Sequence, residues 1–225
     1  MKKLLAAIIA AALLLSGCSL SSRPAVSAPP AETPSLSPTP IVTPTPESEP
    51  SDDELVLVRD YIPGIFIDLK YATTDNFTGQ VIYDSDEAYL RYGTVKKLLA
   101  AQNELSGRGL SLKIWDAYRP VNAQFKLWEI CPNPVYVSDP NNGYSKHSRA
   151  NTVDITLVTS TGESIPMPSG FDDFTSLADR DYSDVSAEAA ENARLLESIM
   201  VENGFVPYSG EWWHYSDSVS YDVYG

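Results

Sequence analysis

Residues 145–157 read Ser-Lys-His-Ser-Arg-Ala-Asn-Thr-Val-Asp-Ile-Thr-Leu, and they predict a strand around which the other elements can be placed. Apolar and polar side chains alternate over residues 153–157, which is the pattern of a strand with one apolar and one polar face. Asp154 stands on the polar face, so we expect its side chain to point away from the apolar layer. His147 lies in the segment that leads into this strand.

Outward from this strand, the sequence predicts further helices and strands in irregular order. Amphipathic spacing predicts helices over residues 87–105, 120–130 and 186–202. Short apolar runs predict strands over residues 112–116, 205–208 and 212–216. Pro120 is placed to begin the second helix, Ser186 to cap the third, and Gly204 to stop it. Because no regular βαβ alternation is present, we predict an α+β fold with a central antiparallel sheet flanked by helices.

The chain divides into three regions by composition. Residues 54–225, about 170 in number, suffice for one compact domain with a sizeable core. Residues 18–53 are rich in Pro, Ser and Thr and have too few large apolar side chains to build a core, so we expect a disordered linker. Such a linker is semi-rigid and, at about 3.1 Å per residue, reaches up to roughly 100 Å.

Residues 1–17 are typical of a secretory signal peptide. Lys2 and Lys3 precede an apolar run over residues 4–15, which is too short to cross a bilayer. The run ends in Leu-Ser-Gly-Cys, which resembles the bacterial lipobox and predicts acylation of Cys18. We therefore expect an exported protein that is lipid-anchored on the outer side of a bacterial cell membrane. The alternative is an ordinary signal peptide with a chance cysteine.

Charge and cysteine content exclude several classes of function. Loss of Lys2 and Lys3 with the signal lowers the formal net charge from −14 to about −16. A surface this acidic should not bind nucleic acid or anionic lipid by charge, so membrane contact would come from the acyl chains alone. With Cys18 acylated, Cys131 has no partner for a disulfide, and we interpret it as a small buried hydrophobic residue rather than a nucleophile.

The chain has only two histidines, and each lies in a segment that also holds a carboxylate. A lone histidine is usually a core or surface residue, but this double pairing favours a metal site. A catalytic zinc ion takes three protein ligands and keeps a fourth position for water. His147, Asp154 and His214 supply the three ligands. Glu211 is then the expected general base.

The spacing of Glu211 and His214 imposes a geometric condition on the last strand. On a regular strand two residues three apart point to opposite faces. Either Glu211 lies before the strand or a bulge re-aims it, and Gly210 is suited to a turn there. Trp212 and Trp213 are predicted to pack in the core rather than to bind a ligand.

Arg119 ends the segment Trp-Asp-Ala-Tyr-Arg, where the predicted strand gives way to a helix. One interpretation is an ion pair with one of the many acidic residues. The other is stabilisation of the oxyanion of a tetrahedral intermediate. The residues alone leave both interpretations open.

Four stretches, in one order along the chain, carry a resemblance to a known family. They are residues 68–79 (Asp-Leu-Lys-Tyr-Ala-Thr-Thr-Asp-Asn-Phe-Thr-Gly), 116–120, 147–157 and 211–215. In these stretches the chain resembles the D-alanyl-D-alanine dipeptidases of the vancomycin-resistance type, within the zinc D,D-peptidases. The resemblance spans about residues 60–216.

The resemblance implies a zinc dipeptidase that hydrolyses D-alanyl-D-alanine or a similar small D-amino-acid dipeptide. The implied roles are ligation of one zinc ion per domain by His147, Asp154 and His214, base catalysis by Glu211, polarisation of the scissile carbonyl by Arg119, and substrate binding by Tyr71, Ser145 and Asp172. Tyr71 and Asp172 would receive the substrate ammonium, with Asp173 as the alternative to its neighbour. A buried anion facing a free amino terminus favours dipeptides over long peptides.

The sequence departs from the family at two points. Ala150 stands where the family usually has Gly, and Thr152 where it has a small residue such as Ala. If that Gly adopts positive φ, Ala150 strains the loop by about 1 kcal/mol or more. The export signal also differs from the cytoplasmic resistance enzymes, so cell-wall turnover or dipeptide scavenging is the expected role.

Two alternative functions compete with dipeptide hydrolysis. The first is a D,D-carboxypeptidase or endopeptidase that cuts peptidoglycan stem peptides. The second is an inactive, wall-binding lipoprotein, although pure binding has no use for a general base at Glu211.

Overall fold

The computed structural model describes residues 48–225. The predicted signal peptide, the predicted acylation of Cys18 and nearly all of the predicted linker lie outside the described residues. Within the described part, none of the helices combines the length and the apolar character that crossing a membrane requires.

Two sheets form the framework of the domain. The larger contains, in spatial order, β2 (Phe66–Ile67), β4 (Leu110–Asp116), β5 (Thr152–Thr159), β7 (Glu211–Asp217) and β6 (Phe205–Tyr208). Its neighbouring strands are antiparallel, as predicted, except that the short edge strand β2 runs parallel to β4. The smaller sheet pairs β1 (Leu55–Leu57) with β3 (Tyr89–Arg91). The predicted α+β class is confirmed, with a mixed rather than purely antiparallel central sheet.

Within residues 48–225, four α-helices accompany the sheets: α1 (Val58–Tyr61), α2 (Tyr92–Ser106), α3 (Val121–Ile130) and α4 (Ala187–Glu202). Ser186 caps α4 as predicted, because its hydroxyl accepts a hydrogen bond from the amide of Ala189. The helix predicted from residue 87 begins instead at Tyr92. Leu90 pairs with Val56 in the smaller sheet, so the preceding residues are held extended as β3.

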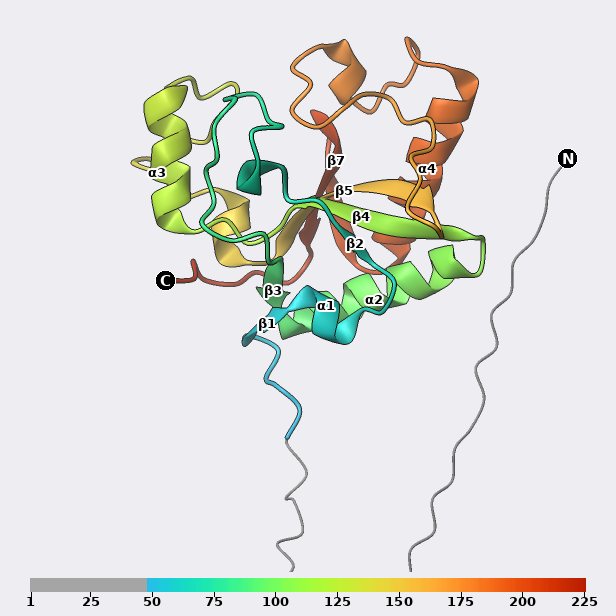
Figure 1. Cartoon of the computed structure of the whole chain (residues 1–225), viewed down its shortest axis with the longest axis horizontal. Coiled ribbons are helices and arrows are strands. Elements are labelled where there is room, and N and C mark those ends of the chain that lie inside the picture. The colour runs from blue at the N-terminus through green and yellow to red at the C-terminus, as the bar shows by residue number, and fades with distance from the viewer. Residues whose placement is uncertain (1–47) are drawn as a thin grey trace, which may run out of the picture. The chain divides into compact units, whose positions relative to one another are not determined.

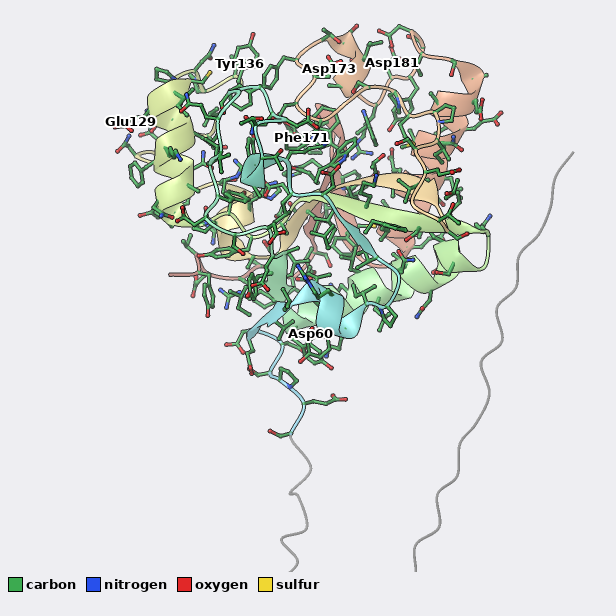
Figure 2. The ribbon with its side chains drawn as sticks, viewed as in Figure 1. Asp60, Glu129, Tyr136, Phe171, Asp173 and Asp181 are labelled. Atoms are coloured by element: carbon green, nitrogen blue, oxygen red, sulfur yellow. The ribbon has the colours of Figure 1, made fainter. Side chains whose placement is uncertain are left out.

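Helices cover one side of the larger sheet, and connecting segments cover the other. Helices α2 and α4 contact each other and pack against the larger sheet. The connecting segments over residues 68–88 and 160–185 lie on the opposite side of the sheet from α2 (Figure 1). The chain enters the domain beside β1, at the opposite end from the loops that carry Tyr136 and Asp173 (Figures 1 and 2).

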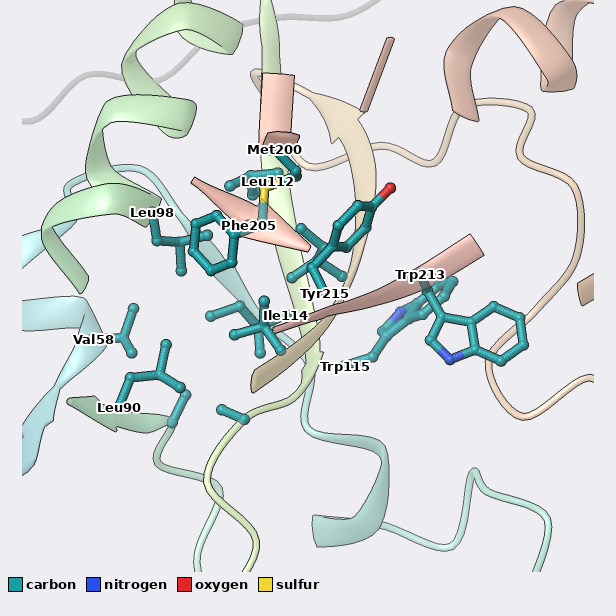
Figure 3. Close-up of a cluster of buried hydrophobic side chains, with 14 of the residues drawn as sticks. Val58, Leu90, Leu98, Leu112, Ile114, Trp115, Met200, Phe205, Trp213 and Tyr215 are labelled. Carbon is teal, nitrogen blue, oxygen red and sulfur yellow. The ribbon is translucent and has the colours of Figure 1, made fainter. Parts of the chain in front are cut away.

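The hydrophobic core fills the space between the larger sheet and its helices. Leu98 of α2 lies near Phe205 and Met200, and all three are almost fully buried (Figure 3). Trp115 and Trp213 lie on the other side of the strands (Figure 3), where their ring centroids are 6.5 Å apart. The sheet is therefore covered on both faces, by helices on one and by loops rich in aromatic residues on the other.

Leu98 provides a test of this packing. We expect Leu98→Ala to lower the free energy of unfolding by about 2–5 kcal/mol, because the side chain is fully buried and its loss leaves a cavity. Leu99→Ala is the matched control, since Leu99 is only partly buried on the same helix and should cost less. Urea unfolding of both variants measures the difference. Equal losses would contradict the placement of the helix.

Candidate active site and metal centre

The site is built on a row of polar residues across three strands. Asp154 of β5 pairs with Asp116 of β4 on one side and with His214 of β7 on the other. Residues directly opposite each other in a sheet project from the same face. The pairing of β4 with β5 shifts by one residue at Trp115, and this bulge brings Asp116 opposite Asp154.

His147 comes from the loop before β5. It lies in a short 3-10 helix, Lys146–Arg149, which begins where the Ser145 hydroxyl accepts a hydrogen bond from the His147 amide. The helix ends at Ala150, which is buried and has a φ of 58°. The position therefore does require the left-handed conformation that favours glycine, and Ala150 bears a strain of about 1 kcal/mol or more.

The three predicted metal ligands converge. His147 Nε2 lies 3.2 Å from Asp154 Oδ2, and His214 Nδ1 lies 2.9 Å from Asp154 Oδ1. The two ring nitrogens are 3.4 Å apart, and all three ligand atoms lie within 4.8 Å of one another. Within residues 48–225 this is the one group of three or more His, Cys, Asp or Glu residues that could hold a metal ion.

The protonation of these groups suits a metal. His147 Nδ1 lies 2.8 Å from the carbonyl oxygen of Ala117, so it carries the hydrogen and leaves Nε2 as the free ligand atom. Burial by itself would raise the pKa of Asp154, but the positive charge that His147 and His214 carry when protonated, with their hydrogen bonds, holds that pKa well below its usual range, and a bound cation would act on Asp154 in the same way. Asp154 therefore offers a charged oxygen, as a metal ligand must.

Glu211 reaches the same place through a bulge in β7. Tyr215 pairs with Pro207 and Glu211 with Tyr208, which leaves residues 212–214 without partners on β6. Glu211 is the first residue of β7, and its Oε2 lies 3.5 Å from His214 Nδ1. Of the two predicted geometries, Glu211 before the strand or a bulge within it, the structure adopts the bulge. Burial, and then the charge of Asp154, raises the pKa of Glu211, which makes it a better proton acceptor.

Arg119 forms the ion pair that one interpretation anticipated, and its partner is Asp116. Its Nη2 lies 2.6 Å from Asp116 Oδ2, and its Nη1 donates to Gln124 at 3.0 Å. Tyr83 donates to the other oxygen of Asp116 at 2.5 Å. Asp116 also lies 3.6 Å from His147 Nδ1, so one buried carboxylate joins Arg119 to His147, a predicted metal ligand.

Asp116 lies in one of the stretches that carry the resemblance, but the sequence predicted no role for it. The sequence signal for such a role was an acidic residue at the end of a strand with many apolar residues, three residues before Arg119. A buried carboxylate is costly unless it is paired and hydrogen-bonded.

Asp172 and Asp173 point to different partners. Asp172 has a φ of 54° and accepts a hydrogen bond from the Tyr71 hydroxyl at 2.9 Å. Asp173 instead accepts hydrogen bonds from the amide and hydroxyl of Thr175 in its own turn. Figure 2 shows Phe171 inside the domain and Asp173 at its outer end. Burial is the main cause that raises the pKa of Asp172 to about 8.

Ser145 borders a cavity of about 260 Å³ that opens beside the predicted base. The cavity is also lined by Pro134, Val135, Tyr136, Ser138, Lys146, Tyr208, Glu211 and His214. Tyr71 and Asp172 do not line it, so the predicted ammonium site lies elsewhere around the cluster.

The remaining expectations concern packing. Trp212 and Trp213 are almost fully buried, as predicted for core residues. Cys131 is only half-buried and packs at the edge of the core.

Comparison with known proteins identifies the family of this chain. The sequence profile described as "D-ala-D-ala dipeptidase" matches residues 51–221. The D-alanyl-D-alanine dipeptidase of Escherichia coli (strain K12) is 40% identical over 162 residues, which are 72% of this chain and 83% of that protein. The enzyme of that name from Enterococcus faecium is 36% identical over 68% of this chain and 86% of its own length. One from Streptomyces coelicolor is 37% identical over 72% of this chain and 91% of its own length. The chain therefore belongs to the D-Ala-D-Ala dipeptidase family.

Proposed function

We propose that this protein hydrolyses D-alanyl-D-alanine or a closely similar dipeptide with one zinc ion held by His147, Asp154 and His214. One observation carries the proposal. Three ligand atoms lie within 4.8 Å of one another, and a fourth group, the Glu211 carboxylate, lies 3.5 Å from one of them. Two imidazoles and one carboxylate form a donor set that suits zinc, with a position left for water. The names of the relatives support the choice of substrate.

The chemistry divides between the metal and the side chains. When bound, zinc lowers the pKa of a coordinated water to about 7. Glu211 accepts the proton of the attacking water and passes it to the leaving amine. Its raised pKa helps both steps, because the carboxyl group must hold the proton between them. An inactive, wall-binding protein has no need of this fourth group.

Arg119 stabilises the charge that develops on the scissile carbonyl oxygen. A guanidinium group has five N–H groups in a fixed plane. Asp116 accepts from Nε and Nη2 and Gln124 from Nη1, so Nη1 and Nη2 each keep one further hydrogen for the substrate. Asp116 fixes the plane of the guanidinium and so decides where these hydrogens point.

Asp172 and Tyr71 receive the substrate ammonium. The Asp172 carboxyl is partly buried, and burial raises its pKa to about 8, so the group stays mostly neutral near pH 7 unless a cation pairs with it. The ammonium of a free dipeptide provides that counter-ion, whereas a stem peptide presents a neutral amide at the same place. A buried charge left unpaired costs several kcal/mol, so dipeptides are favoured over stem peptides. We assign the reaction to cell-wall turnover or dipeptide scavenging.

The metal and the base are tested together in the full-length protein. We expect His214→Ala to lose zinc, because it removes one of three ligands. Glu211→Gln should keep zinc at one per chain and lose about 10²–10⁴ in kcat, because the ligands remain and the base does not. Metal analysis and D-Ala-D-Ala hydrolysis measure the two effects. Glu163→Gln, an exposed acid, is the control and should match the wild type.

Two results would contradict these assignments. Full zinc occupancy in both His214→Ala and His147→Ala would exclude the ligand set. Near-normal turnover in Glu211→Gln would exclude the base.

Acetylation of the substrate tests the ammonium site. We expect N-acetyl-D-Ala-D-Ala to have a kcat/KM at least about 10²-fold below that of D-Ala-D-Ala, because the ammonium is lost. Asp172→Asn should narrow this gap, and asparagine tolerates the positive φ at this position. Asp173→Asn is the matched control and should leave the gap unchanged. A wild-type gap below about threefold would favour the carboxypeptidase or endopeptidase alternative.

We also propose that Cys18 is acylated and anchors the exported protein to the membrane. The lipobox-like sequence and the apolar run before it support this proposal. Labelling cells with a fatty-acid analogue should mark the wild-type protein and not Cys18→Ser. Catalysis should be the same in both, because Cys18 lies outside the catalytic domain. Equal labelling of the two proteins would refute the anchor.

A further inference from the structure

We propose that Arg180 is a positioning residue that holds Glu211 and His214 in their working geometry through their main-chain carbonyls. The roles of those two residues rest on the proposed function. Arg180 itself comes from the segment between β5 and α4, next to Asp181 on the outer loop (Figure 2).

The need for such a residue arises from the bulge in β7. Three successive residues, Trp212 to His214, have no partners on β6, although they lie between two paired positions. A bulge disrupts the ladder of main-chain hydrogen bonds that would otherwise hold the strand. Buried main-chain carbonyls that lose a ladder partner require another donor. The bulge therefore re-aims Glu211 only if something outside the hairpin stabilises it.

The Arg180 guanidinium supplies those donors. Its Nη2 donates to the carbonyl oxygens of Glu211 at 3.0 Å and of His214 at 3.1 Å. Its Nε donates to the carbonyl oxygen of Tyr208, across the turn, at 2.7 Å. One side chain thus contacts Tyr208, Glu211 and His214 at the same time.

The guanidinium is held rigidly in this position. Its Nη1 donates to Glu197 of α4 at 3.0 Å and to the Tyr215 hydroxyl at 3.1 Å. The guanidinium carbon lies 4.7 Å from the centre of the Tyr215 ring, and the side chain is only 11% exposed. A second contact holds the bulge from the same segment, where the Trp212 indole donates to the Ser169 hydroxyl at 2.9 Å.

Lysine cannot replace arginine here. An ammonium group carries three donors at one point, whereas the guanidinium spreads five over a plane. Three carbonyl oxygens, a carboxylate and a hydroxyl lie around that plane. Arg180→Lys keeps the charge and the ion pair with Glu197 but loses the simultaneous contacts to the bulge.

The test compares full-length Arg180→Lys and Arg180→Ala with the wild type. Displacement of a reacting group by about 1 Å costs on the order of 10² in rate. We expect kcat for D-Ala-D-Ala to fall at least tenfold in Arg180→Lys and about 100-fold in Arg180→Ala, with KM changed less than about threefold. Millimolar methylguanidinium should restore part of the kcat of Arg180→Ala. Zinc affinity, measured by chelator competition, should fall in both variants because His214 is displaced.

Two control variants separate positioning from stability. Arg194→Lys alters an exposed arginine on α4 whose guanidinium lies 5.5 Å from the centre of the Tyr182 ring, and it should behave as the wild type. Glu197→Gln keeps a hydrogen-bond acceptor for Arg180 and removes the charge, so it should change kcat less than threefold. Circular dichroism and thermal unfolding confirm that each variant is folded at the assay temperature. If Arg180→Ala does not fold, the Lys and Gln variants decide.

The outcomes are distinct. A folded Arg180→Lys with wild-type kcat and zinc affinity overturns the proposal. So does a loss in Glu197→Gln equal to that in Arg180→Lys, since the ion pair would then account for the effect. If the wild type itself does not cleave D-Ala-D-Ala, the proposed function fails, while the zinc affinities of the Arg180 variants still decide whether Arg180 positions His214.

Discussion

The registration of three strands around Asp154 is the constraint on which the site depends. Asp154 faces Asp116 on one neighbouring strand and His214 on the other, and each pairing follows from a ladder of main-chain hydrogen bonds. Two irregularities make this possible, one at Trp115 in β4 and one after Glu211 in β7. A slip of one residue in either ladder would turn a site residue to the opposite face. The sheet alone therefore sets the relative positions of Asp116, Asp154 and His214, and loops supply the other residues of the site.

The loops complete the site by supporting conformations that are unfavourable by themselves. Ala150 adopts positive φ at the end of the His147 loop, and tertiary contacts hold it there. The Arg91 amide donates to the Ala150 carbonyl, and its side chain donates to the Arg149 carbonyl. The amide of Tyr224, which lies after the last strand, donates to the carbonyl oxygen of Ser148. Several hydrogen bonds of about 1 kcal/mol each are enough to offset the strain at one residue.

Local pattern predicted much of the fold and the grouping of His147, Asp154 and His214. The strand at Asp154 and the helix capped by Ser186 follow from side-chain periodicity and a local hydrogen bond, so both were predictable. The start of α2 was not, because Leu90 pairs with a residue far away in sequence. The role of Asp116 depends on Tyr83 and His147, which no local pattern places beside it. Likewise, no local pattern separates Asp172 from Asp173; the resemblance favoured Asp172, and in the structure Asp172 accepts the hydrogen bond from Tyr71.

One end of the domain leads away from its surface, whereas the other end is packed against it. This difference decides at which end the protein can be coupled to a solid support. Residues 48–50 lead away from the body of the domain beside β1 (Figure 1). The last residues are bound in place, with the rings of Tyr221 and Tyr224 against the Arg91 guanidinium. A bead, fusion partner or sensor surface joined ahead of residue 48 leaves the loops with Tyr136 and Asp173 facing the solution. The same attachment at residue 225 would pull on the segment that hydrogen-bonds to the His147 loop.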